Sequence, residues 1–222
     1  MKNLIINGIV FLVFGFLTPQ IAQAQGTIYL SSLNQTSTGS ASVGGDSWLA
    51  EPFETGNDAS GYVLNSIQLG MTDASGNPSG FTVMVYTRDN NPGGVFPGSS
   101  LGTLNGSLNP VTSGAYTYAD DSDITLSPHT FYFIMLTAGT SVANGAFSWS
   151  ESAYPPNSIG VWNEGNGIFK SSNGISGWSV TPYLGIGQFA INATAVPEPG
   201  GLSLFVLGGL LLGFGRWKAK AV

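Results

Sequence analysis

Short apolar runs, separated by clusters of Gly, Asn, Pro and Ser, fill the chain between residues 25 and 195. No part of this region shows a sustained apolar period of 3.6 residues, which a surface helix would require. Short apolar runs bounded by turn residues are typical of β-strands. The pattern predicts strands at 62–69, 81–87, 115–118, 124–126, 131–137, 147–150 and 188–193, with weaker strand patterns at 48–53 and 178–180. This spacing predicts an all-β fold, a single antiparallel β-sandwich that is jelly-roll-like.

The composition supports this fold class. Glycine accounts for 32 of the 222 residues, and charged residues make up 8%, against a typical share of about 25%. A helical bundle would need many more charged side chains, whereas 42% hydrophobic residues can still build a core. The length suits one domain with short targeting segments, so we predict a single ectodomain over 25–195.

Acidic residues dominate this predicted domain. Between 25 and 195 the basic residues are Arg88 and Lys170, against eleven acidic residues, which gives a net charge of about −9. A nucleic acid would be repelled by this charge, so the sequence argues against nucleic-acid binding. The chain contains no cysteine, which excludes disulfides and thiolate zinc sites.

The N-terminal segment has the pattern of an export signal. Lys2 is followed by an apolar run over 4–17, a polar break and the small-residue sequence Ala22-Gln23-Ala24. This order is typical of a secretory signal peptide. We therefore predict a signal peptide over 1–24, with cleavage after Ala24 directed by Ala22 and Ala24.

The C-terminal segment has the pattern of a membrane anchor. Residues 200–215 carry no charge, and three basic residues follow them, Arg216, Lys218 and Lys220. Sixteen helical residues span about 24 Å, somewhat less than a hydrocarbon core of about 30 Å. Basic residues after an apolar span favour a cytoplasmic end. We predict a single transmembrane helix within the tail 196–222, with the rest of the protein outside the membrane.

Immediately before this span stands the motif Pro197-Glu198-Pro199. The motif, the Gly- and Leu-rich span and the short basic end together resemble the PEP-CTERM sorting signal of Gram-negative bacteria. The resemblance implies recognition by an exosortase-type membrane transpeptidase, with processing of the tail, in cells that produce exopolysaccharide. The alternative is an ordinary single-span anchor preceded by a chance Pro-Glu-Pro.

The predicted domain also resembles the choice-of-anchor ectodomains, most closely those of type R. The similar segments lie at 51–56, 62–67, 85–93, 100–104 and 126–132, within a stretch of about 45–193. The resemblance implies an extracellular β domain and implies no activity, cofactor or catalytic residue.

A hydrolase motif is present but stands in the wrong context. Residues 98–102 fit the pattern G-x-S-x-G around Ser100, and His129 follows later in the chain. A nucleophile elbow needs a strand before the serine and a helix after it. The flanking residues here are typical of loops and strands, so we expect no catalytic triad.

Acidic residues offer two further hypotheses. Glu51 with Glu54, or Glu151 with Glu164, would make a glycosidase pair if they faced one cleft. The densest acidic cluster comprises Asp120, Asp121 and Asp123. We expect this cluster to form a solvated turn, with a weak calcium site as the alternative.

Tryptophans flanked by Asn, Ser and Gly are the remaining candidates for a site. Trp149, Trp162 and Trp178 would form sugar-stacking platforms if they were exposed, although most tryptophans in a β-sandwich belong to the core. The function expected from the sequence is therefore that of an exported, non-enzymatic structural or interaction protein of the cell envelope or exopolysaccharide matrix. A carbohydrate-binding module or adhesin is the alternative, and a secreted hydrolase is less favoured.

Overall fold

The computed structural model describes residues 26–89, 95–165, 167–180 and 185–197. The predicted signal peptide, with Ala22 and Ala24, lies outside the described residues. So do Glu198, Pro199 and the predicted transmembrane span with its basic end. Pro197 is the one residue of the Pro-Glu-Pro motif that the structure describes.

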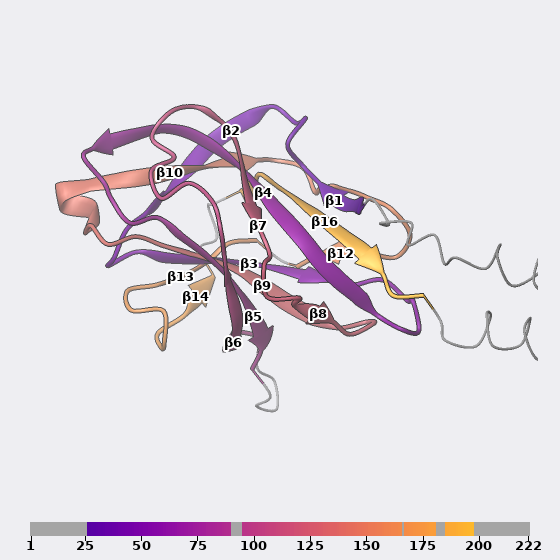
Figure 1. Ribbon diagram of the computed structural model, residues 1–222. Coiled ribbons are helices and arrows are strands. Elements are labelled where there is room, and N and C mark those ends of the chain that lie inside the picture. The colour runs from indigo at the N-terminus through magenta and orange to yellow at the C-terminus, as the bar shows by residue number, and fades with distance from the viewer. Residues whose placement is uncertain (1–25, 90–94, 166, 181–184, 198–222) are drawn as a thin grey trace, which may run out of the picture.

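The described chain forms two antiparallel sheets, one of them strongly curled (Figure 1). The prediction of an all-β domain is thereby confirmed. A short 3-10 helix, η1 (Val142–Asn144), precedes one of the strands. The first sheet contains, within the described residues, β1 (Thr27–Ser31), β2 (Ser37–Val43), β4 (Tyr62–Gly76), β7 (Gly114–Ala119), β8 (Thr125–Leu126), β10 (Gly145–Ser152), β11 (Asn157–Ser158), β15 (Ile186–Gly187) and β16 (Phe189–Ala195).

The second sheet follows the order β14-β13-β3-β9-β5-β6, and β12 also pairs with β3. Its strands in the described part of the chain are β3 (Trp48–Glu54), β5 (Thr82–Arg88), β6 (Pro97–Leu104), β9 (Phe131–Thr137), β12 (Asn163–Glu164), β13 (Phe169–Ser171) and β14 (Ser179–Val180). The central strand β9 pairs with β3 on one side and β5 on the other.

Each predicted strand segment overlaps a strand of the structure. The sequence patterns missed β1, β2, β6 and four shorter strands. In β2 the residues are mostly Ser, Gly and Ala, and β6 contains two glycines and a proline. Such strands form because a neighbouring strand offers backbone partners, which single-residue preferences do not report.

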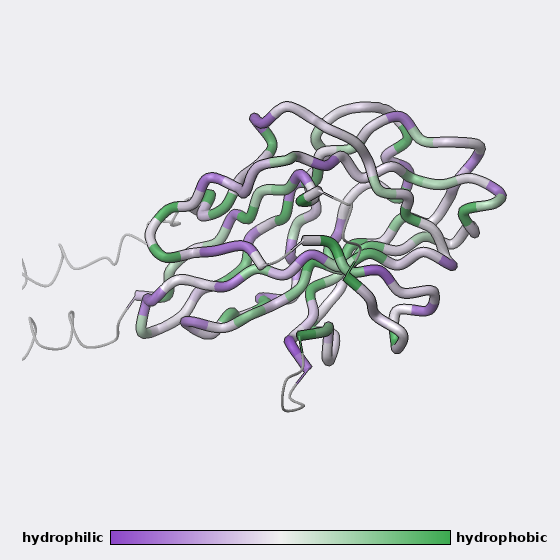
Figure 2. The backbone as a smooth tube through the Cα atoms, turned by 180° about the vertical axis from the view of Figure 1, so that it is seen from behind, coloured by the Kyte–Doolittle hydropathy of each residue, from purple (hydrophilic) through white to green (hydrophobic). Residues whose placement is uncertain are grey.

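The main core lies between the two sheets. The second sheet contributes Phe53 and Ile134, and the first contributes Ile67 and Phe147, all of them buried. Figure 2 shows hydrophobic and hydrophilic residues alternating along parts of the strands, as expected when one face of each strand is buried. A second, smaller cluster covers the opposite face of the second sheet; we call this the outer face.

The two ends of the described chain lie together. Thr27 at the start of β1 pairs with Ala193 near the end of β16. The Val196 N–H then donates to the Gly61 carbonyl at 3.0 Å, so the last strand is held up to the residue before Pro197. Both ends of the domain therefore leave from the same end of the molecule (Figure 1).

Candidate functional site

Trp149 does not form a ligand platform. Its side chain is completely buried, and its indole N–H donates to the Gln188 carbonyl at 3.0 Å. The ring packs so closely on Gly187 that a Cβ there would lie 2.2 Å from it. The exposure that a sugar-stacking platform requires is therefore not met at Trp149, because its side chain in β10 points into the core.

Trp162 is also a core residue, with 2% of its surface exposed. The indole stacks on Tyr29, with ring centroids 4.7 Å apart, and on Phe53, with centroids 6.2 Å apart. Tyr62 meets the same ring edge-on at 4.9 Å. Three aromatic neighbours thus surround the indole, so the exposure that a sugar-stacking platform requires is not met at Trp162.

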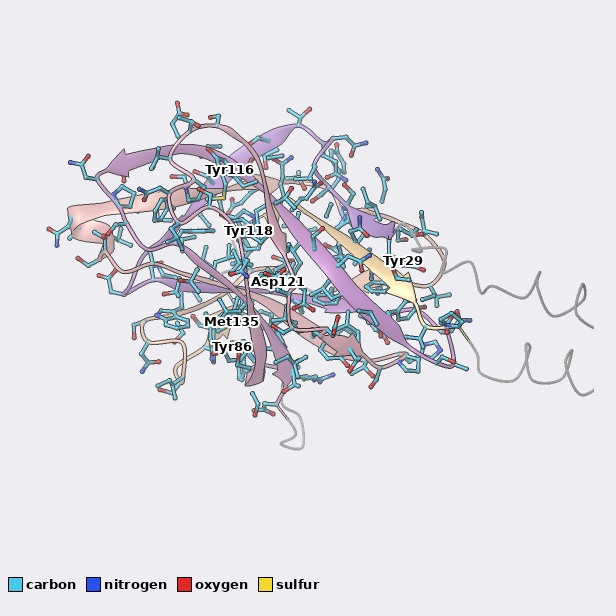
Figure 3. The ribbon with its side chains drawn as sticks, viewed as in Figure 1. Tyr29, Tyr86, Tyr116, Tyr118, Asp121 and Met135 are labelled. Carbon is cyan, nitrogen blue, oxygen red and sulfur yellow. The ribbon has the colours of Figure 1, made fainter. Side chains whose placement is uncertain are left out.

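Trp178 lies in a different environment. It is half-buried and packs against the outer-face cluster of the second sheet. The buried members of this cluster are Ala50, Met84, Phe133, Met135 and Phe169. Figure 3 labels two residues of this face, Tyr86 and Met135. Of the three predicted ligand aromatics, Trp178 alone lies at a face that is open to solvent.

A cleft of about 310 Å³ opens on the outer face. Phe133 and Phe169 form its floor, with ring centroids 5.8 Å apart in an edge-to-face arrangement. Phe131 lies on the same face because residues two apart on β9 point the same way. The remaining lining residues are Pro52, Arg88, Val95, Asn163, Glu164 and Gly165.

Two ionisable side chains line this cleft: Arg88 at the end of β5 and Glu164 in β12. The Arg88 guanidinium lies over the Phe131 ring, with its carbon 5.4 Å from the ring centroid. This distance is within the range of a cation–π interaction. Glu164 immediately precedes Gly165, whose N–H donates to the Pro52 carbonyl at 2.9 Å. Burial raises the pKa of Glu164 to about 7.

A second hollow of about 390 Å³ adjoins the cleft and shares Arg88 and Phe131 with it. His129 lines this hollow from an exposed turn with a φ of 48°. Ser100 lies inside β6 and pairs with Tyr86, so no strand-to-helix elbow surrounds it. The expectation that residues 98–102 lack a hydrolase elbow is confirmed.

The predicted glycosidase pairs are not assembled across the cleft. Glu51 is completely buried between the sheets, where its Oε2 accepts the Gly187 N–H at 3.4 Å. Burial raises the pKa of Glu51 well above its usual range, the Gly187 N–H lowers it, and nearby Glu164 and Glu151 raise it further. Glu151 is 5% exposed, and burial raises the pKa of its carboxyl too. Glu164 is thus the member of this group that lines the cleft.

The acidic cluster at 120–123 stabilises a turn. The Asp120 carboxylate accepts the backbone N–H groups of Ser122 and Ile124. The Asn105 amide donates to Asp121, which Figure 3 labels, and Asp123 adopts a φ of 55°. Among the described residues no group of three acidic or histidine side chains is arranged to hold a metal ion. The hydrogen bonds of Asp120 show the expected turn, and the calcium alternative stays a hypothesis.

The segment around Trp162 contains both a residue suggested by the sequence and residues that line the cleft, and these are different residues. The stretch around Trp162 was singled out for its tryptophan, and the structure instead places Asn163 and Glu164 in the cleft. Arg88 was detectable only as one of two basic residues between 25 and 195. Phe131 gave no signal, because an apolar residue in a predicted strand is expected in the core. Phe169 gave none because it lies in β13, which the sequence patterns missed.

Comparison of the chain with protein-family models, with curated proteins and with solved structures gives no match. The resemblances to the sorting signal and to the choice-of-anchor domains therefore stay predictions. Within the described residues, no helix has the length and apolar character needed to cross a membrane. The predicted span at 200–215 falls outside those residues.

Proposed function

We propose that this chain is an exported, non-enzymatic interaction protein of the bacterial cell surface or exopolysaccharide matrix. Its folded part is a jelly-roll-like β-sandwich, sorted by an exosortase-type membrane transpeptidase. The observation that carries the proposal is the position of the folded domain between the two end signals. The first strand begins at Thr27, three residues after Ala24, and the last ends at Ala195, two residues before Pro197.

The cleft is consistent with binding rather than catalysis. Among its described lining residues Glu164 is the single carboxylic acid. Two-carboxyl glycoside hydrolysis needs a second acid across the cleft. The aromatic floor and the polar rim are instead typical of a binding site.

The sorting proposal predicts processing at the tail. The double change Pro197→Ala with Glu198→Ala should leave full-length chain in the inner membrane, because the motif for the transpeptidase is gone. In the unaltered protein, mass spectrometry of the surface form should show residues 200–222 to be absent. Removal of 196–222 should release a soluble, folded domain, since no strand of the structure is lost. Recovery of the 216–222 sequence from the mature surface protein would contradict processing and support an ordinary anchor.

Carbohydrate binding is a second candidate, favoured by the composition of the outer-face cleft. Phe131 presents a half-buried ring beside an amide, a carboxyl group and a guanidinium. Aromatic rings pack on the C–H faces of sugars, and planar polar groups bind their hydroxyls. The net charge of about −9 between 25 and 195 favours an uncharged glycan over an acidic one.

This candidate predicts that Phe131→Ala weakens binding of a neutral polysaccharide about tenfold, equivalent to roughly 1.4 kcal/mol. The affinity would be measured by calorimetry with a neutral β-glucan and with an acidic uronate polymer. Ile175→Ala provides the matched control, because Ile175 is 85% exposed and lies outside the cleft. Equal loss in both variants, or no binding of any glycan, would remove this candidate.

A further inference from the structure

β2 is a free edge of the first sheet. It pairs with β10 from Ser37 to Val43 and, in the described part of the chain, with no other strand. Five of its seven residues are exposed. An edge strand turns alternate backbone N–H and C=O groups away from the sheet, where they can pair with another strand. β2 therefore offers a seven-residue strand as a template for pairing, in which the Ser42 carbonyl also accepts the Ser47 hydroxyl at 2.7 Å and the Gly39 carbonyl the Ser37 hydroxyl at 3.1 Å.

This edge lacks the features that usually protect an edge strand. Natural sheets block edge pairing with charged residues, prolines, bulges or covering segments. Residues 33–45 include neither a charged residue nor a proline. The one irregularity in the pairing of β2 with β10 lies at its first residues, so the register from Gly39 to Val43 is regular.

The other edges of the described sheets are protected or short. β6 begins at Pro97 and has two register shifts against β5. The connection 105–113 runs beside β7. Asn105 forms a β-bridge with Ala119, and the Tyr118 hydroxyl donates to the Ser107 carbonyl at 3.1 Å. β11 and β14 each have two residues. β2 is thus the long, regular edge that remains.

We propose that β2 pairs with β2 of a second copy of this chain, in antiparallel orientation about a two-fold axis at Ser40. The first sheets of the two copies then form one continuous sheet. In this register Thr38 faces Ser42 of the second copy, Gly39 faces Ala41, and the two Ser40 residues face each other. A two-fold interface brings the same surface of both copies together, so it must be self-complementary. A charged residue in β2 would therefore lie near the same residue of the second copy, and β2 contains none.

The charge distribution supports this choice of surface. The chain carries a net charge of about −9 between 25 and 195, so two copies repel each other at most approaches. The β2 strand itself contains no charged residue, so it brings no like charges into the contact. The β2 edge lies apart from the outer-face cleft, and its pairing does not depend on the sorting signal.

The absence of cysteine from the native chain provides a direct test. In the full-length chain, purified in detergent, Ser40→Cys introduces a single thiol that can form a disulfide only with another copy. Residues that face each other in antiparallel strands have a Cβ separation close to that of a disulfide. Under mild oxidation we expect about tenfold more covalent dimer than from the exposed control Ser172→Cys, because pairing raises the local thiol concentration.

Two further variants make the test decisive. Thr103→Cys places the thiol on the exposed face of β6 and reports pairing at that edge instead. Ser40→Lys sets two ammonium groups opposite each other and should abolish the dimer seen by light scattering, whereas Ser172→Lys should not. Equal cross-linking of Ser40→Cys and Ser172→Cys, dominant cross-linking of Thr103→Cys, or a native chain that is monomeric by light scattering would each overturn the proposal.

Discussion

Replacing Trp149 by alanine should lower the free energy of unfolding by about 3–5 kcal/mol, the usual cost of removing a buried aromatic side chain. The indole is completely buried within β10, which pairs with β4 and β2. Its N–H bond to the Gln188 carbonyl would also be lost, which leaves that carbonyl without this donor. Urea unfolding of the 25–197 domain, followed by circular dichroism, measures the change.

Trp178→Ala is the matched control for this prediction. The same side chain is removed, but Trp178 is half-buried at the outer face. We expect a loss of about 1 kcal/mol, typical of a substitution outside the core. A loss in Trp149→Ala no larger than in Trp178→Ala would contradict the burial of Trp149 and restore it as a ligand residue.

Replacing Glu51 by glutamine should stabilise the domain at pH 7, because burial raises the pKa of the Glu51 carboxyl group well above its usual range. Glu51 is buried between the sheets, and its Oε1 has no hydrogen-bond partner among the described residues. To fold at pH 7 the carboxyl group must either take up a proton or keep a buried charge, and proton uptake costs about 1.4 kcal/mol per pH unit above the ordinary pKa. Glutamine is neutral at every pH and retains an oxygen for the Gly187 N–H.

Glu51 and two other carboxyl groups, those of Glu151 and Glu164, make the stability depend on pH. Because burial raises the pKa of Glu51, Glu151 and Glu164 in the folded state, the folded protein binds more protons than the unfolded chain. Stability is therefore full below the unfolded pKa of about 4.5 and falls as the pH rises, through about 7 for Glu164. We expect the melting temperature to fall between pH 5 and pH 8, with a smaller slope in Glu51→Gln.

A control for net charge is available on the same strand. Glu54→Gln also removes one negative charge, but Glu54 is half-buried at the end of β3. We expect it to leave the melting temperature at pH 7 within a degree or two of the native value, roughly 0.5 kcal/mol or less. Equal stabilisation by the two variants would show that overall repulsion, rather than burial of Glu51, sets the pH dependence.

The strands that the sequence predicted are those marked by a run of large apolar residues. Continuous apolar strands such as β9 were found because burial on both faces leaves a run of large side chains. β2 was missed, since its Ser, Gly and Ala residues join the sheet through backbone pairing with β10. The site was harder still, because the cleft residues do not follow strand alternation. Trp162 is buried, whereas its next two neighbours, Asn163 and Glu164, both line the cleft, although alternation would place Trp162 and Glu164 on the same side.

The pairing of the first strand with the last has a consequence for the order of folding. β16 is placed between β1 and β4, and the Ser32 hydroxyl reaches the Gly187 carbonyl across 155 residues of chain. When the chain becomes available from its N-terminus, β1 comes first and must wait for β16 before the first sheet can close. Contacts so distant in sequence also make folding slow. The topology therefore sets the order of assembly, because the first sheet is completed only after the last described strand is available.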